Sequence, residues 1–246
     1  MDKRLKELID KSHRIVFFGG AGVSTESGIP DFRSEKGLYN AQEKYGYNPE
    51  TMLSHSFYMR HNKLFYKYYK ENLIYPDAVP GNAHRTLAYL EEIGKLRAVV
   101  TQNIDNLHQM AGSKKVFQLH GSVDRNYCES CGRFYDLDYI MNEENCEDGV
   151  PKCSCGGRIK PDVVLYEESL DEDVISGAVK AISEADLLII GGTSLAVYPA
   201  AGLIDYFRGD NLVLINKTHT PRDSMATLAI YDSIGKVMGL DEYTCY

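Results

Sequence analysis

The sequence lacks the features that would tie the chain to a membrane or to nucleic acid. Its longest purely apolar stretches, such as Leu187–Ile190, are far too short to cross a bilayer. The net charge is −8, and no dense cluster of Lys and Arg is present to neutralise phosphates, so neither nucleic acid nor a membrane is an expected partner. The charged N-terminal residues lead into no apolar segment of a secretory signal, which favours a cytoplasmic protein. Internal repeats are absent too, and no pattern indicates an oligomeric state.

What the sequence does contain is a regular alternation of apolar patterns. Apolar residues make up 43% of the chain, which argues against disorder. Continuous apolar runs predict strands covered on both faces, as in parallel sheets with helical crossovers. These runs are Arg14–Phe18, Leu96–Thr101, Val116–Leu119, Asp186–Ile190 and Leu212–Ile215, and Val163–Leu165 also reads as extended. Helical spacing predicts helices over residues 2–11 and Val174–Ile182, and one from an N-cap at Asn82 to Gly94 with Leu87, Leu90 and Ile93 inward.

Six cysteines in a chain without a signal peptide favour metal binding or catalysis over disulfides. Cys128 and Cys131 form one close pair, and after 21 intervening residues Cys153 and Cys155 form another. This arrangement resembles a zinc ribbon, in which four thiolates gather around one tetrahedral ion. Most zinc knuckles have two residues inside each pair, whereas the second pair here has one, so Cys146 is an alternative fourth ligand. We expect one structural Zn²⁺ per chain on Cys128, Cys131, Cys153 and Cys155, with reduced free thiols as the alternative.

Together these patterns predict an α/β fold. We expect a Rossmann-like doubly wound parallel sheet, with a smaller zinc-ribbon module and a helical module inserted into it. Residues 1–30, 79–122 and 163–246 would form the Rossmann-like domain. Residues 31–78 would be a helical insertion with a cofactor loop, and residues 123–162 the zinc-ribbon insertion.

A glycine-rich turn follows the first predicted strand. Gly20-Ala21-Gly22 could bring backbone N–H groups against a pyrophosphate. The usual dinucleotide fingerprint has a third glycine three positions later, where this chain has Thr25, and no acidic residue ends a second strand about twenty residues on. On spacing alone, a purely structural turn therefore stays open as an alternative.

Longer stretches carry more information than this spacing. Five runs resemble, in the same order, motifs of the sirtuin family of NAD-dependent protein deacylases, of the bacterial type. They are Gly20–Arg33, Thr101–Asp105, Leu119–Gly121, Gly192–Leu195 and Val197–Ala201. The resemblance covers nearly the whole chain. It implies that NAD is a co-substrate lying across the carboxyl ends of the strands, and that acyl-lysine proteins or peptides are the partners.

The resemblance also assigns parts of NAD to particular residues. The glycine loop would line the pyrophosphate and ribose, the residues after the second strand would hold nicotinamide, and the residues after the last strands would hold adenosine. The implied NAD-binding residues are Gly20, Ala21, Gly22, Thr25, Phe32, Arg33, Gln102, Asn103, Ile104, Asp105, His120, Gly192, Thr193, Ser194, Asn216, Lys217 and Asp232. Asp105 would accept a hydrogen bond from the carboxamide.

His120 and Asn103 are the implied catalytic residues. A histidine directly after a strand, in a polar cleft, has an intrinsic pKa close to working pH. In the implied chemistry the acyl oxygen attacks C1′ of the nicotinamide ribose and nicotinamide leaves. His120 then acts as general base on a ribose hydroxyl, giving free lysine and acyl-ADP-ribose. His84 and His108 are expected to be structural or to support the site residues from behind, and His13, His55, His61 and His219 are expected to lie on the surface.

Two segments resemble the walls between which the family holds its peptide substrate as an added strand. They contain Val163, Leu165 and Tyr166 on one side and Val197 on the other. Glu167 stands where the family has a glycine after the aromatic residue. Most aromatic side chains between residues 57 and 75 are expected to pack a small helical core, while some could wall the acyl-lysine tunnel.

The acyl preference follows from a further alignment. Family members that remove succinyl or malonyl groups carry a Tyr-x-x-Arg pair, whose arginine pairs with the acyl carboxylate. In this chain Tyr66 aligns with the tyrosine, and Tyr69 replaces the arginine. Acetyl-lysine, or lysine with a longer apolar acyl group, is therefore expected to be preferred over succinyl-lysine, unless Arg60 or Lys67 reaches the tunnel. An NAD-dependent mono-ADP-ribosyltransferase is the alternative enzyme, and a non-catalytic NAD-sensing module is a third reading.

Overall fold

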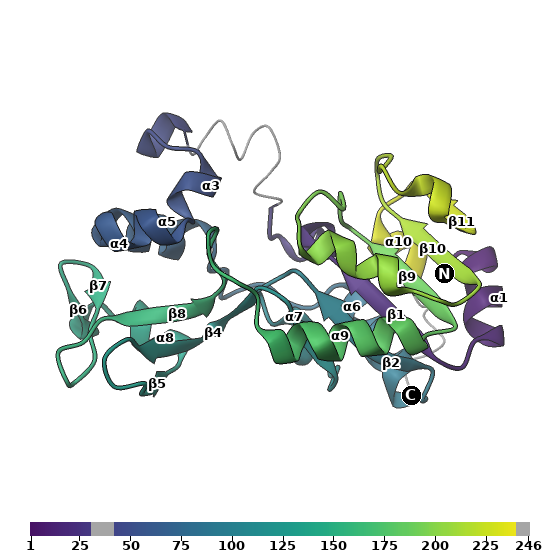
Figure 1. Cartoon of the computed structure of the whole chain (residues 1–246), viewed down its shortest axis with the longest axis horizontal. Coiled ribbons are helices and arrows are strands. Elements are labelled where there is room, and N and C mark those ends of the chain that lie inside the picture. Colours follow the sequence, from purple (N-terminus) through teal and green to yellow (C-terminus); the bar gives the residue numbers. More distant parts are fainter. Residues whose placement is uncertain (31–41, 240–246) are drawn as a thin grey trace.

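The computed structural model describes residues 1–30 and 42–239 (Figure 1). The larger of its two parts is built on a six-stranded parallel sheet. Its strands are β1 (Ile15–Gly19), β2 (Leu96–Thr101), β3 (Val116–Gln118), β9 (Leu187–Gly191), β10 (Asn211–Ile215) and β11 (Leu228–Ile230). Their order is β11-β10-β9-β1-β2-β3, so the chain builds outward from β1 in one direction and then from β9 in the other. This doubly wound order places a ligand crevice beyond the carboxyl ends of β1 and β9, where the direction reverses.

Helical segments cover both faces of this sheet. Both faces of β1 are buried, which explains why its sequence is wholly apolar. The side chains of Ile15 and Phe17 face one core, and those of Val16 and Phe18 face the other. The first core is closed by α1 (Lys3–Lys11), α6 (Asn82–Glu92) and α10 (Ile234–Met238), and the second by α9 (Glu172–Glu184) and η4 (Ala200–Tyr206). The predicted α/β fold is thus confirmed.

A smaller module extends from one end of the sheet, on the left of Figure 1. It contains an antiparallel sheet in the order β5-β4-β8 and a hairpin, β6-β7. Its strands are β4 (Gly121–Cys128), β5 (Phe134–Tyr135), β6 (Cys146–Glu147), β7 (Val150–Pro151) and β8 (Ile159–Val163); its helices are α3 (Pro49–Met52), α4 (His55–Arg60), α5 (Asn62–Asn72), α8 (Leu137–Met141) and η3 (Glu143–Asn145). Aromatic residues of α4 and α5 supply much of its core, as predicted for the majority of them.

The remaining elements are short helical turns within the loops of the large sheet. They are η1 (Ala21–Val23), η2 (Thr25–Ser27), α7 (Leu107–Met110) and η5 (Asp223–Met225). Asn82 proves to be the first residue of α6, not its N-cap, because Gly81 holds that position and its N–H donates to His84 Nδ1 (3.1 Å). Ile93 does not point inward; it lies beyond the last helical turn and is 49% exposed.

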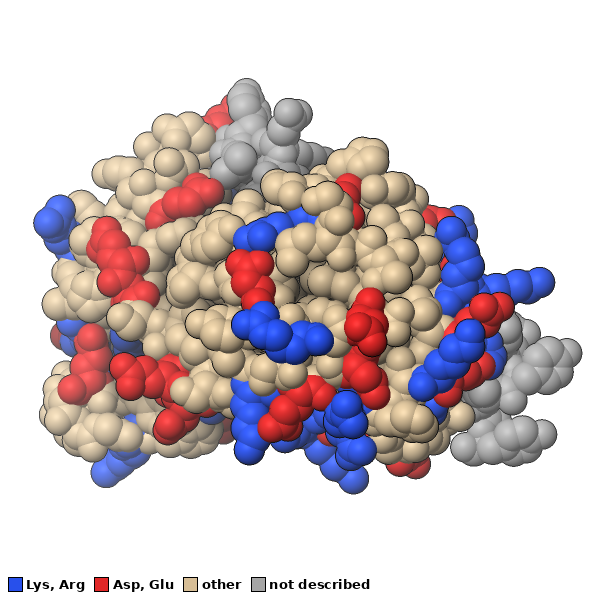
Figure 2. Space-filling model, turned by 45° about the vertical axis from the view of Figure 1, so that its right-hand side comes forward, with Lys and Arg blue, Asp and Glu red and all other residues tan. Residues whose placement is uncertain are grey.

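Two further features of the molecule are the length of its helices and the distribution of charge on its surface. Among residues 1–30 and 42–239, no helix combines the length and apolar character that a bilayer crossing requires. On the face shown in Figure 2, Lys and Arg side chains are interspersed with Asp and Glu.

Candidate functional site

A cavity of about 310 Å³ lies beside the carboxyl ends of β1, β2 and β9, at the reversal of strand order. It is bounded by the loops that follow these strands and by the segment after β8. Sequence-predicted residues in its lining are Gly20, Ala21, Gln102, Asn103, Ile104, Asp105, His120, Val163, Leu165, Tyr166, Gly192, Thr193, Ser194 and Val197. Residues more than 170 positions apart in the chain thus meet in one cavity.

The other predicted residues fall outside this lining. Gly22 and Thr25 lie in the loop just behind it, where the Thr25 hydroxyl donates to the Gly22 carbonyl (3.1 Å). Asn216 directly follows β10 and Asp232 follows β11, so both lie at the edge of the sheet that bears the cavity. Of the rest, Lys217 adjoins Asn216, while Phe32 and Arg33 lie outside the described residues.

The glycine loop packs against the loop after β9. Gly22 N–H donates to the Gly192 carbonyl (2.8 Å), and a Cβ on Gly22 would lie 2.6 Å from Gly192 Cα. Gly192 itself has a φ of +60°, a conformation that glycine adopts without strain. In this chain η1 and η2 are short 3₁₀ turns, so no long helix begins here that would need the third glycine of the dinucleotide fingerprint. This explains why Thr25 is tolerated.

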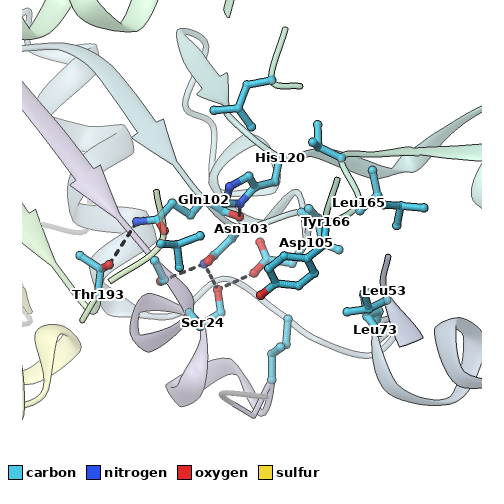
Figure 3. A pocket seen from close by; sticks show the side chains of 18 of the residues that line it. Ser24, Leu53, Leu73, Gln102, Asn103, Asp105, His120, Leu165, Tyr166 and Thr193 are labelled. Atoms are coloured by element: carbon cyan, nitrogen blue, oxygen red, sulfur yellow. Dashed lines mark hydrogen bonds between the residues drawn. The ribbon is translucent and has the colours of Figure 1, made fainter. Parts of the chain in front are cut away.

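Four polar groups at the cavity wall bind one another (Figure 3). Asn103 Nδ2 donates to the Gly20 carbonyl (3.1 Å) and to Ser24 Oγ (3.0 Å), and Ser24 Oγ donates to Asp105 (2.5 Å). Burial raises the pKa of the Asp105 carboxyl, although the Ser24 hydroxyl and the Leu107 N–H oppose this rise. The network fixes the side chains before any ligand enters. Sequence reasoning had not assigned Ser24 to the site, although it lies inside the first matching run.

His120 lies at the start of the chain's passage from β3 to β4. Its Nδ1 is 2.9 Å from the Gln102 carbonyl oxygen. A carbonyl can only accept, so Nδ1 carries the proton, and in the neutral ring Nε2 holds the lone pair. Gly121 has a φ of +75°, and a Cβ there would lie 1.8 Å from the Asp162 carbonyl oxygen. The residue after His120 must therefore be glycine.

The opposite part of the cavity is apolar. Leu53, Leu73 and Leu165 lie on this side in Figure 3, with Tyr166 between them and the polar network. Tyr166 is anchored to the helical module, since its N–H donates to the Leu53 carbonyl and its carbonyl accepts from His55 N–H, both at 2.9 Å. Leu53 and Leu73 come from the helical insertion and were not predicted as site residues, because apolar positions there read as core.

Tyr66 and Tyr69, in contrast, do not line the cavity. Both rings are fully buried in the core of the small module, and the Tyr66 hydroxyl donates to the Ile159 carbonyl. Arg60 and Lys67 are also absent from the lining, which contains no Lys or Arg among the described residues. Among the described residues, no Lys or Arg side chain lines the cavity that could pair with a negatively charged acyl group.

The buried histidines are separate from this site. The ring of His84, on α6, lies 4.7 Å from the ring of His108, on α7, and neither lines the cavity. Burial lowers the pKa of His84 to about 4 and that of His108 to about 3, so both rings are neutral at physiological pH. The structural role predicted for them fits this environment.

The four predicted zinc ligands meet at the far end of the small module. The sulfur atoms of Cys128, Cys131, Cys153 and Cys155 all lie within 4.8 Å of one another. The sulfur–sulfur distance is 3.5 Å for Cys128–Cys155 and 3.6 Å for both Cys131–Cys153 and Cys131–Cys155. A tetrahedral Zn²⁺ with Zn–S bonds of about 2.3 Å has sulfur–sulfur edges of about 3.8 Å, so the cluster fits. Cys146 is not part of it; its sulfur lies 3.5 Å from Lys70 Nζ.

The four thiols are close enough to influence one another's protonation. Hydrogen bonds from the Cys155 N–H and the Tyr135 hydroxyl lower the pKa of Cys153 to about 6. The hydrogen bond between Cys155 and the Gly157 backbone lowers the pKa of the Cys155 thiol. The neighbouring Cys153 and Cys128 groups outweigh it and raise this pKa to about 12. Like charges this close cannot all form without a counter-ion. The four cysteines are therefore consistent with a structural zinc.

Comparisons with known proteins agree on one family. A sequence model described as the Sir2 family matches residues 20–199. The chain is 64% identical over 238 residues to an NAD-dependent protein deacetylase of Clostridium perfringens (strain 13 / Type A), covering 96% of each chain. Among solved structures, a Sir2 with deacetylated p53 peptide and 3′-O-acetyl-ADP-ribose superposes with a TM-score of 0.86 at 40% identity, covering 96% of this chain and 95% of that one. A Sir2–p53 peptide–NAD⁺ complex gives 0.85 at 39% identity, covering 97% and 96%.

Proposed function

Since this chain belongs to the Sir2 family and is an NAD-dependent protein deacetylase, we propose that its cavity holds NAD and acetyl-lysine with His120 as the general base. The observation that carries the proposal is the bond between His120 Nδ1 and the Gln102 carbonyl. It fixes the tautomer and leaves Nε2 as the basic atom. The reaction yields nicotinamide, O-acetyl-ADP-ribose and the free lysine.

The polar network would orient the co-substrate. NAD supplies the electrophilic C1′ of its ribose and nicotinamide as the leaving group. Asp105 already accepts from Ser24 and from Leu107 N–H, but a carboxylate has further lone pairs that can accept from a carboxamide. Asn103 donates both bonds recorded for its Nδ2, so its Oδ1 is the atom suited to accept from a ribose hydroxyl.

The remaining proposed NAD contacts extend along the same edge of the sheet. The glycine loop would face the pyrophosphate, and residues after β9, β10 and β11 would hold adenosine. Support for this arrangement comes from the strand order, which places these loops side by side. The adenosine group comprises Thr193, Ser194, Asn216, Lys217 and Asp232.

Acetylated and propionylated peptides are the substrates found with the neighbouring structures, and we propose that they enter between two segments of this chain. One contains Val163, Leu165 and Tyr166, and the other Val197; all four line the cavity. An extended peptide would lie between them as an added strand. We also propose that residues 1–30, 79–122 and 163–246 form the NAD-binding domain, with residues 31–78 and 123–162 inserted into it, and that the protein is cytoplasmic.

Incubation with NAD and an acetyl-lysine peptide tests the proposal. Mass spectrometry should show loss of the acetyl mass from the peptide and formation of acetyl-ADP-ribose, with nicotinamide released in equal amount. Gain of ADP-ribose by the peptide would instead indicate mono-ADP-ribosyl transfer.

A first prediction concerns the acyl group. We expect acetyl-lysine to be preferred over succinyl-lysine in the same peptide by at least ~100-fold in kcat/KM. The described cavity lining has no Lys or Arg, and burying a carboxylate without a counter-charge costs several kcal/mol. Initial rates with the two peptides measure the ratio. Comparable rates would mean that a cation outside the described lining reaches the acyl group.

A further inference from the structure

Glu167 holds an unusual position at the mouth of the cavity. It lines the cavity, its side chain is exposed, and its φ is +76°, which side-chain-bearing residues rarely adopt. The sirtuin resemblance expects a glycine at this position. Keeping a larger residue here requires a compensating interaction, and the structure contains one.

The Glu167 carboxylate is held by neutral donors. It accepts from the Ser56 backbone N–H (2.8 Å) and from the Ser56 hydroxyl (3.0 Å), both in the first turn of α4. These bonds fix where the carboxylate lies but bring no opposite charge to it. Among the described residues, no Lys, Arg or His forms an ion pair with Glu167.

Two other carboxylates among the described lining residues differ in this respect. Glu168 is paired with Lys160 Nζ (3.1 Å) and with His55 Nδ1 (2.8 Å). Asp105 is buried in the polar network described above. Because the described lining has no Lys or Arg either, Glu167 is an exposed carboxylate that a basic side chain of a substrate can approach.

The acetylated lysine cannot be what this charge recognises, because acetylation removes the positive charge of that side chain. A neighbouring residue of the same peptide can carry a positive charge. We propose that Glu167 selects acetylated peptides with a lysine or arginine close to the acetyl-lysine. This inference rests on the proposed function of the cavity and names the substrate class for it.

The expected effect is modest and sensitive to salt. An exposed ion pair changes a rate by a small factor, so we expect kcat/KM for a peptide with Lys beside the acetyl-lysine to exceed that for its Glu counterpart by about fivefold at low ionic strength. The ratio should fall in 0.5 M salt, because counter-ions screen exposed charges.

The test compares three acetyl-peptides that differ only in that neighbouring residue: Lys, Ala or Glu. Wild type, Glu167→Gln, Glu167→Gly and the control Glu92→Gln are assayed side by side. Glu167→Gln removes the charge but can still bond Ser56, and Glu167→Gly suits the positive φ. Glu92, at the end of α6, is exposed and remote from the cavity. Thermal melting checks that each variant folds.

The readout is the Lys-to-Glu ratio, which a uniform loss of activity does not change. We expect it to fall below about twofold in both Glu167 variants and to stay at the wild-type value in Glu92→Gln. A wild-type ratio of one, or a wild-type ratio retained by both Glu167 variants, overturns the selectivity. If the wild type deacetylates none of the three peptides, the proposed function of the cavity fails and the selectivity fails with it.

Discussion

Replacing His120 by alanine is expected to lower the rate of acetyl-lysine removal by about 10²–10⁴-fold while NAD still binds. The loss follows from the position of the ring, whose Nδ1 is bonded to the Gln102 carbonyl so that Nε2 serves as the base. NAD binding should survive because the glycine loop is held by its own contact between Gly22 and Gly192. Product formation measures the rate, and calorimetric titration measures NAD affinity.

The step at which His120 acts gives a second readout. The proposed base works after nicotinamide has left, so exchange of labelled nicotinamide into NAD should fall less than product formation does. His13→Ala is the matched control, since His13 is exposed at the opposite end of β1 and should leave both rates unchanged. Turnover of His120→Ala within about tenfold of wild type would remove the ring from this role.

Loss of one zinc ligand is expected to unfold the small module. Cys128→Ala should lower the melting temperature by about 10 °C or more, since structural zinc contributes many kcal/mol and each kcal/mol corresponds to about 2–4 °C in a chain of this size. Metal analysis of the wild type should give about one zinc per chain, and a strong chelator should reproduce the destabilisation.

Cys146→Ala is the matched control for the metal site. Its sulfur lies beside Lys70 and outside the four-cysteine cluster, so this variant should keep both its zinc and its melting temperature. Cys155→Ala tests the short second pair directly. If Cys146→Ala lost zinc while Cys155→Ala kept it, the fourth ligand would be the wrong cysteine.

The sequence predicts the large sheet well because both faces of its strands are buried. The runs at Leu96–Thr101 and Leu212–Ile215 correspond to β2 and β10 with little change. The edge strand β11 (Leu228–Ile230) was missed, although it has the same length as the edge strand β3 (Val116–Gln118), which was predicted. The β3 run begins with Val and Phe, which favour strands, whereas Leu and Ala in β11 carry little strand preference.

The site could be predicted only where a contiguous run carries it. Asn103 and Asp105 lie in one such run, and the structure brings them to the cavity with His120. Leu53 and Leu73 were missed, because their part in the cavity depends on how the helical module meets the segment after β8. Tyr69 shows the reverse error: its alignment pointed to the tunnel, whereas the ring packs in the core.

One strand joins the two chemically distinct ends of the molecule. Gly121, which follows His120, begins β4, and Cys128, one of the four clustered cysteines, ends it. Its partner β8 runs the opposite way, from Ile159 beside Cys128 to Val163 at the cavity. If the cysteine cluster lost its metal, the proposed base and the proposed peptide wall would be displaced together, because β4 and β8 connect both to the cluster.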